Sequence, residues 1–303
     1  MSPPANASSN PATAHAATLQ GYAAGLGTVL IWAGFILISR LGGRSALTGW
    51  DIVALRLGTA SLLLLPFAGS LPRHVWTDLR LWLMAALGGL VFLVFVYAGF
   101  KIAPAAHGGI LLPGMQPFLV TAMAWLILGS RPSRLRLWCL LPIALGVLCI
   151  AMPQFMGHTN AASTLPGDAL LLTASATWAA YSVLVRKWPV NAWVLTRFVA
   201  FASTLIYLPV YLLWLPKGLH EVPMSMLVLQ GLYQGLGPTI LAMILFLRAV
   251  AILGAERTGA MVAVVPAVAG LGAVPLLGEA LNGWLLAGLV LVSAGAFLSA
   301  RVR

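Results

Sequence analysis

Apolar residues run along the chain in long blocks, and short groups of charged residues, prolines and glycines separate these blocks. The hydrocarbon core of a bilayer is about 30 Å thick, so a helix that crosses it needs ~20 apolar residues. Stretches that meet this requirement are 19–39, 50–69, 79–100, 105–128, 135–152, 169–185, 192–213, 225–248, 259–277 and 283–300. The pattern therefore predicts an all-α integral membrane protein with ten transmembrane helices.

The longest interruption of the apolar pattern is PQFMGHTNAASTLPGD, residues 153–168. It divides the ten helices into five and five, so we interpret it as a linker between a first half, 19–152, and a second half, 169–303. Residues 1–18 contain no lysine, arginine or apolar stretch, and so lack the features of a signal peptide. We expect a disordered N-terminal tail over 1–18, followed by an uncleaved first helix.

The two halves repeat the same landmarks at an offset of 149 residues. The matched pairs are Gly88 with Gly237, Pro117 with Pro266, Gly129 with Gly278, Ser130 with Glu279, and Gly146 with Gly295. Nearer the start of each half, TVLIWAGFILISR (28–40) resembles ASATWAAYSVLVR (174–186), which pairs Trp32 with Trp178. Because each half has an odd number of helices, the second must cross the membrane in the opposite sense. The sequence thus predicts two inverted five-helix repeats, an arrangement typical of secondary transporters.

The chain is 61% hydrophobic and 8% charged, yet its net charge is +11. The basic residues are scattered between apolar runs, so we predict no nucleic-acid partner and interpret the charge as a topology signal. With the N-terminus in the cytoplasm, the inner side receives Arg73, Arg80, Arg131, Arg134, Arg136, Arg186, Lys187, Arg197, Arg248, Arg257, Arg301 and Arg303, and the outer side Arg40, Arg44, Arg56, Lys101 and Lys217. This excess predicts an inner-membrane protein with both termini cytoplasmic.

The order of these features resembles the EamA-type members of the drug/metabolite transporter superfamily. The resemblance covers roughly residues 20–300 and rests on the ten-helix duplication and the motifs repeated in both halves. These motifs are a tryptophan in the first helix (Trp32, Trp178), an arginine in the second (Arg56, Arg197), a proline in the fourth (Pro117, Pro266), and Gly-Glu before the tenth, with Ser130 replacing the glutamate in the first half. The resemblance implies a secondary transporter with a central cavity, often an exporter of amino acids or similar small amphipathic metabolites.

Glu279 is one of six acidic residues, and it lies in AVPLLGEALNGW between two apolar runs. We interpret it as a helix-end carboxylate near the N-terminus of the tenth helix, where the helix dipole favours negative charge; the alternative is a proton-carrying or gate residue. The pattern places no carboxylate, lysine or arginine at mid-membrane. That placement disfavours proton antiport through a central acid and disfavours a phosphate-bearing or strongly anionic substrate.

Matched prolines in the fourth and ninth helices indicate a binding site at mid-membrane, because each proline interrupts the backbone hydrogen bonds of its helix. Pro117 would free the carbonyl of Pro113, and Gln116 lies beside this break; Pro266 takes the corresponding place in the second half. The alternative is a kink that only shapes helix packing. A second candidate region is GLYQGLGP (231–238), whose glycines suit close helix packing, whereas Tyr233 and Gln234 are polar groups that need partners.

Aromatic residues near mid-membrane could form a substrate-binding wall. Trp32 and Trp178, with Tyr97 and Tyr181, would accept an apolar side chain and offer cation–π contact to an ammonium group. Alternatively these rings fill the core. His107 begins the fourth helix and is a candidate for pH sensing or proton handling, although a satisfied helix-end histidine is the simpler interpretation.

We therefore predict a transporter that moves small, largely apolar or zwitterionic metabolites outward by alternating access, with amino acids, including aromatic ones, as favoured substrates. Its partners are the small-molecule substrate and the lipid bilayer, and the oligomeric state stays open. The alternative within transport is an exporter of lipophilic or cationic drugs. An enzyme is not expected, because HExxH and GxSxG motifs are absent from the sequence, and the absence of a Walker loop disfavours ATP-driven transport. We predict no cofactor and no metal; a membrane scaffold without transport is the third class.

Overall fold

The computed structural model describes residues 11–155 and 164–301, and within these residues it contains no strand. Ten of its helices or helix groups are long and apolar enough to cross a membrane, as predicted. The first half consists of α1 (Pro11–Arg44), α2 (Gly49–Leu64) with η1 (Leu65–Ser70), η2 (Arg73–Trp76), α3 (Leu79–Ala85) with η3 (Ala86–Val91) and α4 (Phe92–Ile102), α5 (Ala105–Gly109) with η4 (Ile110–Gly114) and α6 (Gln116–Leu128), and α7 (Arg134–Phe155).

The second half repeats this order of helices. It consists of α8 (Leu165–Lys187), α9 (Ala192–Trp214), η6 (Leu219–Glu221), α10 (Met224–Leu236) with η7 (Gly237–Leu241) and α11 (Ala242–Leu253), α12 (Ala255–Val262), α13 (Val265–Leu277) and α14 (Gly283–Arg301). Helix α1 begins inside the predicted tail, since residues 11–18 are helical, and residues 1–10 lie outside the described residues. Likewise, α7 and α8 extend into both ends of the predicted linker, of which residues 156–163 lie outside the described residues.

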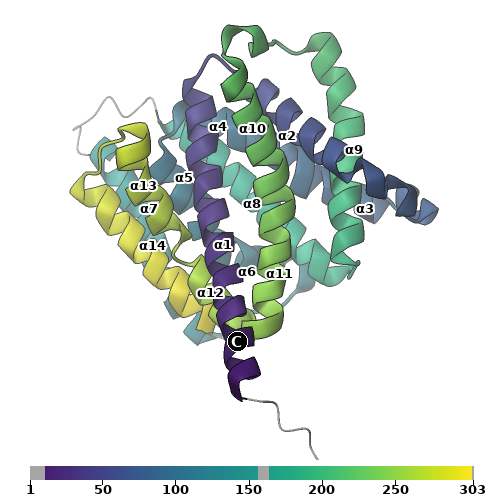
Figure 1. The fold of residues 1–303 in the computed structure, drawn as a ribbon. Coiled ribbons are helices and arrows are strands. Elements are labelled where there is room, and N and C mark those ends of the chain that lie inside the picture. Colours follow the sequence, from purple (N-terminus) through teal and green to yellow (C-terminus); the bar gives the residue numbers. More distant parts are fainter. Residues whose placement is uncertain (1–10, 156–163, 302–303) are drawn as a thin grey trace, which may run out of the picture.

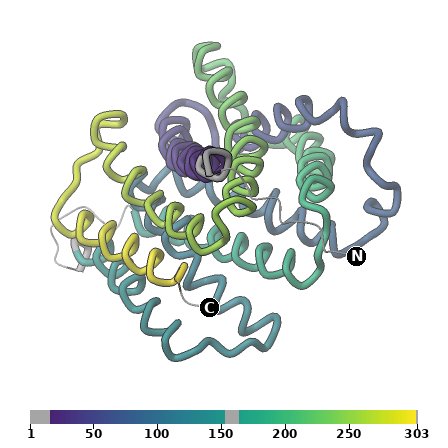
Figure 2. Tube along the Cα trace, turned by 60° about the horizontal axis from the view of Figure 1, so that its bottom comes forward, coloured from purple at the N-terminus to yellow at the C-terminus, as the bar shows by residue number. Residues whose placement is uncertain are grey.

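The two halves cross the bundle in opposite senses. Near the end of α1, Arg40 donates a 2.9 Å hydrogen bond to the carbonyl of Phe100, close to the start of α5. Near the start of α5, His107 bonds Asp168 in the first turn of α8. Helix α8 therefore begins at the level where α1 ends, which confirms the inverted repeat. We call the face that holds Pro11 and Arg301 the terminal face (Figures 1 and 2), and the other the opposite face.

Helices of the two halves pack against one another in matching arrangements. Helix α1 lies along α11 and α4 lies along α8, so the first membrane-crossing helix of each half contacts the third of the other half. Corresponding helices of the two halves also pack together, α2 with α9, α5 with α13 and α7 with α14. This exchange gives the bundle an approximate two-fold relation, and the interior between the halves is lined from both sides.

The predicted repeat landmarks occupy equivalent backbone positions. Gly129 and Gly278 end α6 and α13 with φ of 69° and 64°, the left-handed conformation that glycine adopts at helix C-termini. Gly88 and Gly237 both lie in π-helical turns, η3 and η7, at the middle of the third helix of each half. The two halves therefore share the same backbone irregularities at equivalent positions.

Glycines let α7 and α14 approach closely. A Cβ atom at Gly146 would lie 2.8 Å from the carbonyl oxygen of Gly288, and one at Gly295 would lie 3.0 Å from the backbone nitrogen of Ile143. Small residues of this kind allow membrane helices to pack backbone to backbone. This close backbone contact holds α7 and α14, the last helices of the two halves, together.

We expect Gly146→Ala to lower the stability of the protein in detergent by about 1–3 kcal/mol, because the new methyl group pushes α14 away. Gly58→Ala is the matched control, since a Cβ atom at Gly58 meets nothing within 4 Å, and removing a helical glycine stabilises by about 0.5–1 kcal/mol. Thermal unfolding of both variants measures the difference. Equal midpoints would contradict the close approach of the two helices.

Candidate functional site

The fourth and ninth membrane helices are both broken near their middle. Met115 separates η4 from α6, and residues 263–264 separate α12 from α13. Pro117 and Pro266 occupy the second positions of α6 and α13, where a missing backbone N–H costs nothing. Both breaks occur where the matched prolines predicted them.

The first break is covered by α8 of the other half. The hydroxyl of Ser175 donates a 3.1 Å hydrogen bond to the carbonyl of Leu112, and the Nε2 atom of Gln116 donates to the Ser175 hydroxyl at 2.8 Å. The carbonyl of Pro113, predicted to be free, instead accepts a bond from the backbone N–H of Met115. The backbone at this break is therefore stabilised across the interface between the halves.

A cavity of about 510 Å³ lies between the halves beside these breaks. Its walls are mostly apolar, and they include four of the predicted site residues: Trp32, Gln116, Pro117 and Trp178. The other lining residues are Phe35, Ile36, Arg56, Phe92, Leu112, Pro113, Val120, Arg136, Ser182, Pro238, Phe246, Gly259, Val262, Ala263, Val265, Ala296, Ser299 and Ala300. Because both halves contribute, relative movement of the halves would change the shape of the cavity.

The cavity reaches the terminal face. Its lining includes Arg136 in the first turn of α7 and Ala300 in the last turn of α14, and both turns lie at that face. Along α1 the lining extends to Ile36, which lies one helical turn before Arg40. The space is therefore deepest near the middle of the bundle and ends short of the opposite face.

Two aromatic pairs form parts of the cavity wall. Trp32 of α1 lies against Phe246 of α11, with ring centroids 5.5 Å apart, and Trp178 of α8 lies against Phe92 of α4 at 4.9 Å. Each pair joins a tryptophan of one half to a phenylalanine of the other. Such walls suit a planar or apolar group of a ligand.

The other predicted site residues lie just behind the cavity wall. Tyr181 packs against Trp178, with ring centroids 5.2 Å apart, and the hydroxyl of Tyr233 donates to the carbonyl of Ile31, beside Trp32. Pro266 is buried next to Val265, which lines the cavity. In this conformation these residues support the wall without forming it.

Gln234 and Tyr97 are fully buried. The Nε2 atom of Gln234 donates to the Ser39 hydroxyl at 3.1 Å, which ties α10 to α1 of the other half. Tyr97 accepts a 3.2 Å hydrogen bond from the guanidinium of Arg56. Both residues act here through neighbours, and neither is among the lining residues.

Arg56 corrects the prediction that no basic residue lies deep in the membrane region. It is the eighth residue of α2, only 8% exposed, and its guanidinium lies 5.1 Å from the ring centroid of Phe35. A charged side chain at such depth costs ~2.5–3.5 kcal/mol on the insertion scale. The available signal was its position, because Arg56 is the seventh residue of the predicted span 50–69.

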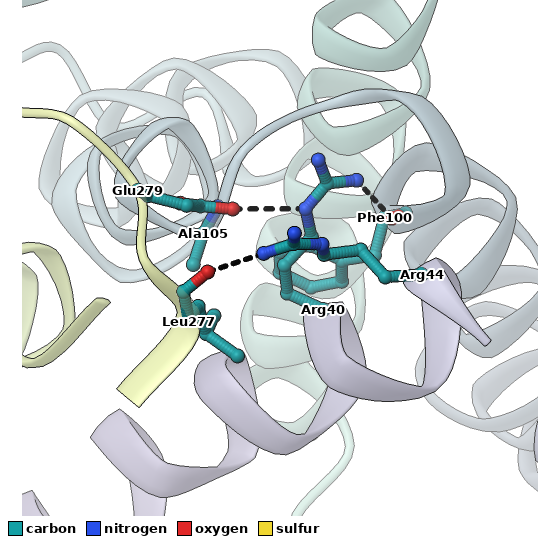
Figure 3. Close-up of polar contacts among 6 residues, drawn as sticks. All are labelled: Arg40, Arg44, Phe100, Ala105, Leu277 and Glu279. Carbon is teal, nitrogen blue, oxygen red and sulfur yellow. Dashed lines mark hydrogen bonds and ion pairs between the residues drawn. The ribbon is translucent and has the colours of Figure 1, made fainter. Parts of the chain in front are cut away.

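Glu279 contacts elements far from its own in the sequence (Figure 3). Its Oε1 atom forms a 2.9 Å ion pair with Nε of Arg40, and its Oε2 atom accepts a 2.8 Å bond from the backbone N–H of Ala105. Arg44 donates to the carbonyl of Leu277. Glu279 thus lies just before the tenth helix, as predicted, but its carboxylate accepts a hydrogen bond from the start of α5. We call Arg40, Arg44 and Glu279 the latch.

The latch lies at the opposite face and joins the halves there. Arg40 and Arg44 belong to α1 of the first half, and Glu279 follows α13 of the second half. The paired side chains are only 15% and 12% exposed, so water weakens their attraction less than it would at an open surface.

His107, 2.8 Å from Asp168, lies at the same face and is not among the cavity-lining residues. Its role in pH sensing stays a prediction.

Ten apolar helices in two inverted halves around a shared cavity define a multi-pass membrane protein with a transporter architecture. The chain belongs to the EamA-like transporter family, whose model matches residues 19–152 and 165–301. The chain is also similar to a protein of known crystal structure, at 21% sequence identity and a TM-score of 0.59, over 94% of this chain and 97% of that one. That likeness supports the fold alone. No curated protein matches the sequence.

We expect Ser175→Ala to lower the free energy of unfolding by about 1–3 kcal/mol, because the buried Leu112 carbonyl and the Gln116 amide both lose a partner. Thr173→Ala is the control, since that exposed hydroxyl bonds the Ala169 carbonyl of its own helix. The measurement is thermal unfolding in detergent. An unchanged midpoint for Ser175→Ala would show that the break needs no support from α8.

Proposed function

We propose that this family member is a secondary transporter that exports small amphipathic metabolites, with amino acids, aromatic ones included, as favoured substrates. The observation that carries the proposal is the aromatic cavity between the inverted halves. This cavity reaches the terminal face, and the latch joins the halves at the opposite face. Its volume of about 510 Å³ falls within the range of about 300–1,000 Å³ typical of small-molecule sites. The basic residues near the terminal face favour both termini in the cytoplasm and placement in the inner membrane.

The charge of the cavity wall bears on the choice of substrate. Arg56 and Arg136 line the cavity, and no aspartate or glutamate is among its described lining residues. A cationic drug would meet the positive charge of Arg56 with no carboxylate among the described lining residues, whereas an amino acid can direct its carboxylate toward Arg56. The wall therefore favours amphipathic metabolites over the cationic drugs that the aromatic rings alone would also suit.

Alternating access requires the opposite face to open while the terminal face closes. The proposed first event at the opposite face is separation of Arg40 from Glu279, which frees α1 from the segment after α13. At the terminal face the repeat-related residue is Ser130, whose hydroxyl bonds the Ala124 carbonyl near the end of its own helix. At the terminal face, therefore, the position related by the repeat forms no ion pair between the halves, unlike Glu279 at the opposite face.

We expect Glu279→Gln to favour opening at the opposite face, because the amide keeps the size of the side chain and loses its charge. A cysteine at position 36, in a chain whose Cys139 and Cys149 are replaced by alanine, reports this opening through a membrane-impermeant thiol reagent added at that face. The labelling rate should rise about fivefold for each kcal/mol of latch stability lost.

The control for the latch experiment is Glu221→Gln, because Glu221 lies at the same face with its side chain 56% exposed. This variant should label like the parent. A Glu279→Gln variant that also labels at the parent rate would show that the ion pair does not hold the face closed.

Transport itself is tested by counterflow of radiolabelled amino acids in proteoliposomes, with and without a pH gradient. We expect Trp32→Ala and Trp178→Ala each to weaken uptake about tenfold at low substrate concentration, equivalent to ~1.4 kcal/mol of binding. Trp138→Ala is the control, since this tryptophan is 70% exposed on the outside of the bundle. Absence of counterflow for every amino acid tested would overturn the substrate assignment.

A further inference from the structure

We propose that Arg56 binds a carboxylate group of the transported molecule, so that the cavity selects small monocarboxylates that carry an apolar or aromatic body. The inference rests on the proposed transport function and names the chemical group by which the cavity would recognise its substrate. Arg56 lines the cavity together with Trp32 and Phe92, and its own ring neighbour Phe35 also lines it.

The guanidinium of Arg56 retains donors that the protein does not use. An arginine side chain carries five N–H donors. One of them is bonded to the hydroxyl of Tyr97, and the structure contains no other hydrogen bond from this guanidinium within the described residues. A buried cation with unused donors beside a cavity favours an anionic acceptor that enters the cavity.

The carboxylates of the chain are placed elsewhere. All six acidic residues lie in the described part of the chain, and no ion pair in that part includes Arg56. Their positions are Asp51 bonded to Thr48, Tyr211 and Gly218, Asp78 capping α3, Asp168 beside His107, Glu221 beside His220, Glu256 in the exposed first turn of α12, and Glu279 in the latch. Within the described part of the chain, therefore, no side-chain carboxylate compensates the charge of Arg56.

Arg197, which the repeat relates to Arg56, is held by protein groups and so serves as a comparison for Arg56. Arg197 of α9 is 4% exposed, yet it donates to the carbonyls of Trp193 and Phe67 and to the hydroxyl of Ser70. It also lies over the ring of Trp193, and it is not among the cavity-lining residues. One arginine of the pair is thus satisfied by the protein, and the other faces the cavity.

The shape and charge of the site favour a carboxylate over a phosphate. A planar guanidinium matches a carboxylate through two parallel hydrogen bonds. One deeply placed arginine neutralises a monoanion, whereas a phosphate dianion would keep excess negative charge among apolar walls. The pairs of Trp32 with Phe246 and Trp178 with Phe92 would then enclose the apolar body.

The test compares binding of 3-phenylpropanoate, its neutral isostere 3-phenylpropanamide, and phenyl phosphate to the full-length protein in nanodiscs, by isothermal titration. We expect the parent protein to bind the carboxylate about tenfold more tightly than the amide, and more tightly than phenyl phosphate. In Arg56→Gln the carboxylate and the amide should bind about equally, with amide affinity changed less than about threefold. Arg56→Lys should retain part of the preference, because it keeps the charge and loses the planar fork.

Arg197→Gln is the matched control, and it should lower thermal stability while leaving the preference for the carboxylate unchanged. If the parent binds the carboxylate and the amide equally, or if Arg56→Gln keeps the preference, the role of Arg56 is overturned while transport of neutral amphipaths stands. Tighter binding of phenyl phosphate would replace the carboxylate assignment. If none of the three phenyl probes binds and no amino acid gives counterflow, the proposed function fails together with this inference.

Discussion

Backbone N–H and C=O groups must be satisfied inside a membrane, because hydrocarbon offers them no hydrogen bonds. A broken helix is therefore tolerated only where protein or an enclosed polar space covers the break. In this chain the two breaks fall at Met115 and at residues 263–264, at equivalent places in the two halves. Ser175 of the second half satisfies the Leu112 carbonyl of the first. The need to cover these breaks draws the halves together at the depth where the cavity lies.

The backbone of the molecule is nearly symmetric, and its charges are not. Pairs of glycines, prolines and tryptophans recur in both halves, and the helices exchange partners accordingly. By contrast, Arg56 faces the cavity while Arg197 is held by backbone carbonyls, and Glu279 has only a serine as its counterpart. Duplication thus accounts for the shared arrangement of helices. The residues that differ between the halves, Arg56 with Arg197 and Glu279 with Ser130, make the two halves of the cavity and the two faces of the bundle different.

The sequence predicted the scaffold because the relevant signals are local. Apolar run length is set by membrane thickness, and the left-handed glycines and the prolines act on their own helices. The sequence could not predict partners that lie far apart along the chain. Glu279 bonds Arg40, 239 positions away, and Gln234 bonds Ser39 in the other half. A linear pattern also says little about which way a side chain faces. For that reason it placed Tyr97 on the cavity wall and Arg56 on the outer side of the membrane.

The ion pair between Arg40 and Glu279 at the opposite face, which has no counterpart at the terminal face within the described residues, has an energetic consequence. An ion pair that exists only while the opposite face is shut adds free energy to that conformation alone, so the resting population leans toward the state whose vestibule meets the terminal side. Such a bias alters how often each shape is visited and how fast the cycle turns over. It cannot choose the net direction of flux, which the gradients of the carried solute and of any coupled ion determine. The same latch would therefore serve uptake or efflux, and its strength would set the pace of either.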